Sequence, residues 1–173
     1  MGFSDSSILL KIALVILGLA SILQIVGLAT PNWSSALTPA GDASISSSFG
    51  LWKFCFSALG KSDCDSYPDA EDWLKICRAF AVIGVLAVIG ATVLEVLCTL
   101  ALSKATHKIV FILATLAAFV GAASIILAAI IWGAKTSDLG TGITLDWSFA
   151  LSILAGVLAG IGGLLVALDI CKG

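Results

Sequence analysis

Two cysteines in a long polar segment have the spacing that most directly indicates chemistry. Cys55 and Cys64 have eight residues between them, which suits two short antiparallel strands joined near their open end. Closing a loop of about ten residues stabilises a fold by roughly 2.5 to 3 kcal/mol. We therefore predict a structural disulfide here. Because disulfides persist outside the cytosol, we also predict that this segment is extracellular.

The second residue that could take part in chemistry is a carboxylate inside an apolar stretch. Glu95 lies about two turns from one end of its apolar stretch, and such a group needs a partner or water. Lys11 lies at a similar depth, so we expect a structural pair, or a protonated glutamate hydrogen-bonded between helices. A proton or ion relay is the alternative, but it would need several such groups, and we identify only Gln24 in addition.

The composition identifies the class of protein that positions these residues. The chain has 173 residues, 60% of them hydrophobic and 12% charged, whereas soluble domains carry about 25% charged residues. A helix of about 20 apolar residues crosses a bilayer core, and four runs are long enough. A single polytopic membrane domain over residues 1–173 is therefore predicted, with spans at 8–29, 79–102, 109–134 and 147–170.

The lysines of a short turn predict how these spans are oriented in the membrane. The short turn at 103–108 contains Lys104 and Lys108, and lysines in short loops favour the cytoplasm. An even number of spans then places both termini in the cytoplasm, and loops 30–77 and 135–146 outside the cell. The net charge of −2 carries no information about partners, because the charges are sorted between loops.

The first loop has the pattern of strands followed by a helix. Short runs at Ala43–Phe49 and Leu51–Phe56, separated by glycine, predict a small antiparallel sheet of three or four strands. Ser66 to Asp69 has the spacing of a capping box with a proline in the first turn. We expect a helix to begin there and to continue unbroken into the second span.

Within the bilayer, small residues four positions apart indicate helix contacts. Such pairs occur at Gly156 and Gly160, at Ala159 and Gly163, and at Ala117 and Gly121. Because this spacing is common in bundles of four spans, we interpret it mainly as packing within one molecule. Contacts between neighbouring molecules are the alternative.

The segment from residue 31 to residue 78 resembles the claudin signature. The matching residues are Trp33, Gly50, Leu51, Trp52, Cys55, Cys64 and Arg78. Peripheral myelin proteins, epithelial membrane proteins and calcium-channel gamma subunits share parts of this pattern. The short stretch from Cys64 to Arg78 is typical of a divergent or invertebrate-type member. The resemblance implies a left-handed four-transmembrane helix bundle with a small extracellular antiparallel sheet.

The resemblance also implies a function that is not enzymatic. Claudin-like proteins associate with each other in the plasma membrane and across cell junctions, including tight junctions, where they form or regulate a paracellular barrier or pore. This implies no catalytic residue, cofactor, metal or nucleic-acid partner. Binding of a PDZ scaffold is not expected because the chain ends in Lys172-Gly173.

An epithelial-membrane or peripheral-myelin type protein, or a channel auxiliary subunit, is the alternative function. A membrane thiol oxidoreductase is more remote, because Cys55 and Cys64 do not form a C-x-x-C motif.

Three further residues are candidate sites by resemblance. Asp65 directly follows Cys64, where several cation-selective claudins have an acidic pore residue, and the loop around it is acidic. Exposed carboxylates are also common on any solvated surface, so both interpretations stay open. Cys98 and Cys171 lie near the cytoplasmic face and are candidates for S-palmitoylation. A small buried side chain is the alternative for each, and Cys77 has no obvious partner.

Overall fold

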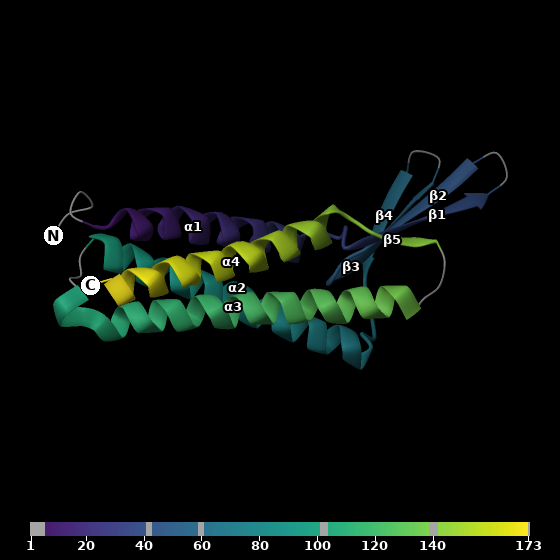
Figure 1. Cartoon of the computed structure of the whole chain (residues 1–173). Helices are drawn as coiled ribbons and strands as arrows, with labels where there is room; N and C mark the ends of the chain where they lie inside the picture. The colour runs from purple at the N-terminus through teal and green to yellow at the C-terminus, as the bar shows by residue number, and fades with distance from the viewer. Residues whose placement is uncertain (1–5, 41–42, 59–60, 101–103, 139–141, 173) are drawn as a thin grey trace.

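The computed structural model describes residues 6–40, 43–58, 61–100, 104–138 and 142–172. Within these ranges, four long helices form a bundle, and an antiparallel sheet extends from one end of it (Figure 1). This confirms the predicted fold class. The helices are α1 (Ile8–Ala29), α2 (Asp72–Leu100), α3 (Lys104–Asp138) and α4 (Trp147–Lys172). The strands are β1 (Ser34–Ala40), β2 (Ala43–Phe49), β3 (Lys53–Ala58), β4 (Lys61–Ser66) and β5 (Ile143–Leu145).

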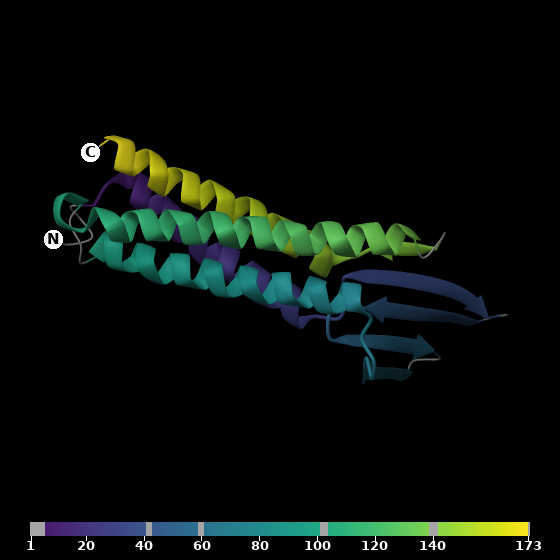
Figure 2. The same ribbon diagram turned by 90° about the horizontal axis from the view of Figure 1, so that it is seen from below.

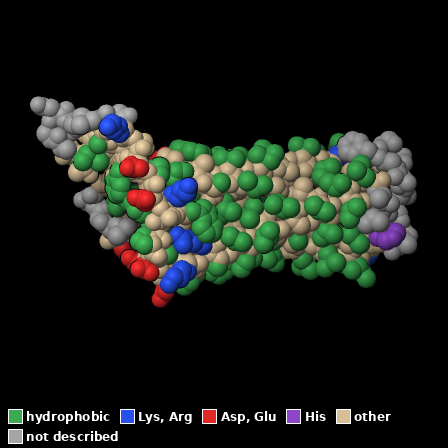
Figure 3. Space-filling view, turned by 180° about the vertical axis from the view of Figure 1, so that it is seen from behind, with side chains coloured by type: hydrophobic (Ala, Val, Ile, Leu, Met, Phe, Trp, Pro, Cys, Tyr) green, Lys and Arg blue, Asp and Glu red, His purple; other side chains and the backbone are tan. Residues whose placement is uncertain are grey.

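All four described helices are long and apolar enough to cross a membrane. Each helix packs against two neighbours, so that α1 contacts α2 and α4, and α3 contacts the same two helices. Apolar side chains cover the visible flank of the bundle, whereas charged side chains gather near the sheet (Figure 3). Val15 and Ile109, for example, are 71% and 73% exposed. Such a surface requires a hydrocarbon solvent.

Small residues allow close approach of the helices within the bundle. A Cβ atom on Gly121 of α3 would lie 2.5 Å from Cγ2 of Val88 on α2. A Cβ atom on Gly156 of α4 would lie 2.9 Å from Cδ1 of Ile126, and one on Gly163 would lie 3.0 Å from Cβ of Ala118. These predicted glycine contacts therefore occur within one molecule.

The sheet has the strand order β4-β3-β2-β1-β5 among the described residues. The first loop supplies four strands, as the prediction of three or four allowed, but β5 was not predicted, because it comes from the segment between α3 and α4 and pairs with β1. With only three residues, β5 is too short to show a strand pattern. The predicted strand at Leu51 actually begins at Lys53, because Gly50 N–H donates to the Lys53 carbonyl at 2.9 Å and closes a turn.

The helix boundaries also differ from prediction. Ser66 does not cap α2, because it is the last residue of β4 and pairs with Lys53. The helix begins at Asp72, and the Glu71 carbonyl accepts the first helical hydrogen bond, 3.1 Å from the Lys75 nitrogen. Figure 2 shows α2 running unbroken along the bundle from the side of the sheet.

Both connections at the ends of α3 are shorter than predicted. In the predicted turn at 103–108, residues from Lys104 onward are helical, with an interruption at His107 (φ −125°, ψ 32°). At its other end α3 extends to Asp138, into the predicted loop 135–146. Residues 101–103 and 139–141 lie outside the described residues.

Candidate functional site

The residues of the predicted motif meet at the junction between the sheet and the bundle. Trp33, immediately before β1, is fully buried, and its Nε1–H donates to the Gly27 carbonyl of α1 at 2.7 Å. Its ring lies 5.3 Å from that of Trp132 and 6.0 Å from that of Phe149, measured between centroids. One side chain thus joins the first strand to α1, α3 and α4.

Gly50 is located where the backbone leaves no room for a side chain. A Cβ atom there would lie 2.4 Å from the Cα of Pro31 and 2.8 Å from the Thr30 carbonyl oxygen. The next residue, Leu51, is fully buried in the cluster that contains Trp33. The glycine therefore brings the turn between β2 and β3 against the end of α1.

Arg78, on α2, forms a hydrogen bond with this turn. Its Nε–H donates to the Leu51 carbonyl at 2.6 Å. Its guanidinium carbon lies 5.2 Å from the ring centroid of Trp52 and 5.5 Å from that of Tyr67. Trp52 is 39% exposed, so it lies at the rim and not in the core beneath the sheet. Its Nε1–H donates to the Leu28 carbonyl at 2.9 Å.

Tyr67 closes the same cluster with a hydrogen bond from its hydroxyl to the Gly50 carbonyl at 3.1 Å. Burial raises the pKa of this phenol to about 12, and the nearby positive charge of Arg78 only partly opposes the shift. The hydroxyl therefore stays protonated and donates throughout the neutral range.

The predicted disulfide joins Cys55 to Cys64, which are directly opposite each other in the β3–β4 ladder. The same register places Asp65 opposite Phe54. Because side chains alternate between the two faces of a strand, Asp65 lies on the face opposite the disulfide. The disulfide instead lines a cavity of about 300 Å³ together with Trp52 and Lys53.

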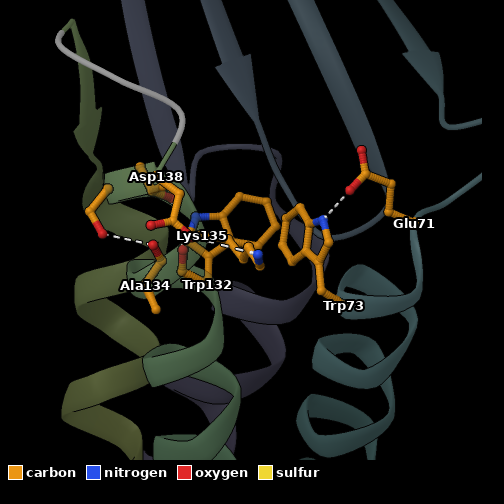
Figure 4. A network of polar contacts seen from close by, with 8 residues as sticks. Glu71, Trp73, Trp132, Ala134, Lys135 and Asp138 are labelled. Atoms are coloured by element: carbon orange, nitrogen blue, oxygen red, sulfur yellow. Dashed lines mark hydrogen bonds and ion pairs between the residues drawn. The ribbon is translucent and has the colours of Figure 1, made fainter.

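On the face seen in Figure 3, charged side chains gather in the zone between the sheet and the apolar flank. Asp65 is exposed on β4. On α2, the Lys75 ammonium lies 3.0 Å from a carboxylate oxygen of Asp72, and both side chains are largely exposed. Figure 4 shows Trp73 donating to Glu71 at 2.7 Å. Asp63 and Asp69 of the predicted loop are also exposed, and Asp42 lies outside the described residues.

Near the other end of the bundle, Glu95 is fully buried, and neither carboxylate oxygen has a hydrogen-bond partner among the described residues. Asp169 of α4 is a second buried carboxylate. Asp169 is 2% exposed and accepts a hydrogen bond from the Ser7 hydroxyl. Sequence reasoning missed Asp169 as an intramembrane residue. The signal was an acidic residue inside the last apolar run, at 147–170.

The unpaired cysteines occupy different environments. The Cys77 thiol is buried and donates to the Ala128 carbonyl at 3.2 Å, which links α2 to α3. Cys98 is buried in the inner core, whereas Cys171 is exposed. An acyl transferase needs an accessible thiol, so Cys171 is the better candidate for palmitoylation.

Over the ranges that the structure describes, no group of three or more His, Cys, Asp or Glu side chains could hold a metal ion.

Together, the bundle and the junction define a membrane protein with four spanning helices and a disulfide-tied sheet mounted on one end. Residues 5–166 match the model of the PMP-22/EMP/MP20/Claudin family. This match covers nearly the whole chain, and the chain belongs to this family. Among curated proteins, none matches the chain significantly in sequence. Members of the family are generally structural proteins and not enzymes.

Proposed function

We propose that this chain is a claudin-type cell-junction protein that forms or regulates a paracellular barrier or pore. The observation that carries the proposal is the attachment of the sheet to the bundle through Trp33, Leu51 and Arg78. A sheet held in this way keeps a defined position relative to the membrane. It can therefore present the same surface to each neighbouring molecule, in one membrane or in the apposed one.

In this proposal the sheet is extracellular and both termini are cytoplasmic. The disulfide between Cys55 and Cys64 supports this orientation, because such bonds persist outside the cytosol. Lys104 and Lys108 lie near the connection between α2 and α3, at the end of the bundle away from the sheet. Lysines in a short loop favour the cytoplasmic side.

Asp65 is the proposed charge for ion selectivity. It is exposed on β4, which is an edge strand of the sheet, and the adjacent disulfide fixes its backbone. In a narrow aqueous passage walled by protein, a fixed carboxylate raises the local concentration of cations. If the passage is narrower than the Debye length of about 8 Å, salt would screen the charge only partly.

The first test expresses the chain in cells that lack junctions and images contact sites by freeze-fracture. Continuous strands are expected for the claudin-type function. Smooth contacts with normal surface delivery would contradict it and favour an epithelial-membrane type protein or a channel auxiliary subunit.

The second test measures the ratio of sodium to chloride permeability across a monolayer. Asp65→Asn should lower this ratio while strands persist. Asp69→Asn is the matched control, because Asp69 is also exposed but lies in the connection before α2. An unchanged ratio in a correctly located Asp65 variant would assign this carboxylate to the solvated surface.

A further inference from the structure

A cavity of about 300 Å³ lies between the end of α1 and the hairpin of β3 and β4. The end of α1 contributes Ala29, Thr30 and Pro31 to its walls, and the side of the hairpin contributes Trp52, Lys53 and the disulfide. Pockets that bind small molecules have volumes of about 300 to 1,000 Å³. The cavity is therefore large enough for a small polar group, such as the head of a lipid.

An apolar stripe on α1 leads from the membrane-spanning part of the helix to this cavity. Its residues are Ile22, Ile25, Val26 and Ala29, and all four are exposed. Residues that are three, four and seven positions apart lie on the same face of a helix. The stripe therefore offers an acyl chain a continuous apolar surface, which ends at Ala29 in the wall of the cavity.

Lys53 is the one charged side chain among the described residues that line the cavity. It is exposed, and no described carboxylate forms an ion pair with it. Because side chains alternate along a strand, Lys53 lies on the same face of the sheet as Cys55 and its disulfide. Asp63 and Asp65 flank Cys64, so both carboxylates lie on the opposite face. The cavity thus has a positive charge that is not neutralised.

The other polar side chains in the cavity walls already have hydrogen-bond partners. The Thr30 hydroxyl donates to the Val26 carbonyl at 2.7 Å, and the Trp52 Nε1–H donates to the Leu28 carbonyl at 2.9 Å. A ligand that carries a negative charge would therefore direct this charge to Lys53. Its apolar part would contact the Trp52 ring and the disulfide.

We infer that this cavity binds the phosphate head of a membrane phospholipid, with one acyl chain along the exposed stripe of α1. Because α1 ends at Ala29, the cavity lies where the spanning helix leaves the bilayer, at the depth of the lipid head groups (Figure 1). Lysines near a membrane surface attract anionic lipid groups, and tryptophans such as Trp52 are typical of this interface. The inference depends on the membrane span and not on the proposed junction function.

The test uses the full chain in maltoside micelles with a trace of phosphatidylcholine that carries a photoreactive group close to its glycerol. Mass spectrometry maps the labelled peptides, and residues 22–31 and 51–55 should dominate. Unlabelled phosphatidylcholine should compete with the probe. Diacylglycerol, which lacks the phosphate, should compete about two- to fivefold less well, as expected for the loss of one exposed ion pair. Soluble glycerophosphocholine should compete at least about tenfold less well, because it has no acyl chain to bury.

Lys53→Gln removes the charge and keeps most of the side-chain length, so labelling should fall about two- to fivefold. Lys61→Gln is the matched control, because Lys61 is exposed on β4 but lies on the face of the sheet opposite the disulfide. Unchanged labelling of the Lys53→Gln variant, labelling spread evenly along the helices, or equal competition by diacylglycerol would overturn the inference. Glycerophosphocholine that competes as well as phosphatidylcholine would also overturn it, because the cavity would then take a free phosphate ester.

Discussion

Arg78→Met should destabilise the protein by about 2.5 to 5 kcal/mol, because Arg78 joins α2 to the turn before β3. Methionine keeps much of the volume but loses the hydrogen bond to the Leu51 carbonyl. A hydrogen bond from a charged donor contributes about 1.5 to 3 kcal/mol. The contacts of the guanidinium with Trp52 and Tyr67 add about 0.5 to 1 kcal/mol each at a partly exposed site.

The measurement is equilibrium unfolding in detergent, followed by circular dichroism. A double-mutant cycle with Trp52→Leu should give a coupling free energy of about 0.5 to 1 kcal/mol, because the two side chains are in contact. Lys75→Met is the matched control on the same helix. Its exposed pair with Asp72 contributes at most about 1 kcal/mol. An Arg78→Met variant no less stable than the control, or strictly additive effects of Arg78 and Trp52, would refute the reasoning.

Three further predictions concern the junction and the bundle. Tyr67 is the only tyrosine, so ultraviolet absorbance of its phenolate should titrate near pH 12 in the folded protein and near 10 after unfolding. Because the pKa of Tyr67 is higher in the folded protein than in the unfolded one, Tyr67 contributes its full stabilisation below pH 10. This contribution to the free energy of unfolding is lost as the pH rises from 10 to 12, and the Tyr67→Phe variant should not show that loss. Cys64→Ser should lower the free energy of unfolding by roughly 2.5 to 3 kcal/mol and retain the protein inside cells; two free thiols at Cys55 and Cys64 in the native protein would contradict this. Gly121→Ala should destabilise the bundle by about 1 to 3 kcal/mol through overpacking against Val88, whereas Gly18→Ala, with open space around it, should be neutral or stabilising.

The sequence predicted the disulfide and the small sheet correctly because both depend on short-range spacing. Cys55 and Cys64 are close in the chain, and the β3–β4 hairpin brings them together. The four helices were predictable for a similar reason. An uninterrupted apolar run of about 20 residues can form few stable structures other than a membrane-spanning helix.

The errors occurred where a distant segment competes with a local signal. Ser66 to Asp69 has the local spacing of a helix start, but Ser66 pairs with Lys53 and stays in the sheet. Similarly, β5 is a strand only because β1 offers it an open edge. Neither partner can be recognised from the sequence near the affected residue.

The sequence by itself determined the membrane class, the disulfide and the family motif, because composition and short spacings carry this information. Only the tertiary structure decided how the motif residues work together. It directed Arg78 to the Leu51 carbonyl, placed Gly50 against Pro31, and left the Trp132 indole N–H without a partner. These contacts join segments far apart in the chain. Their geometry depends on how the helices and the sheet pack, since hydrogen bonds and van der Waals contacts form only at short distances.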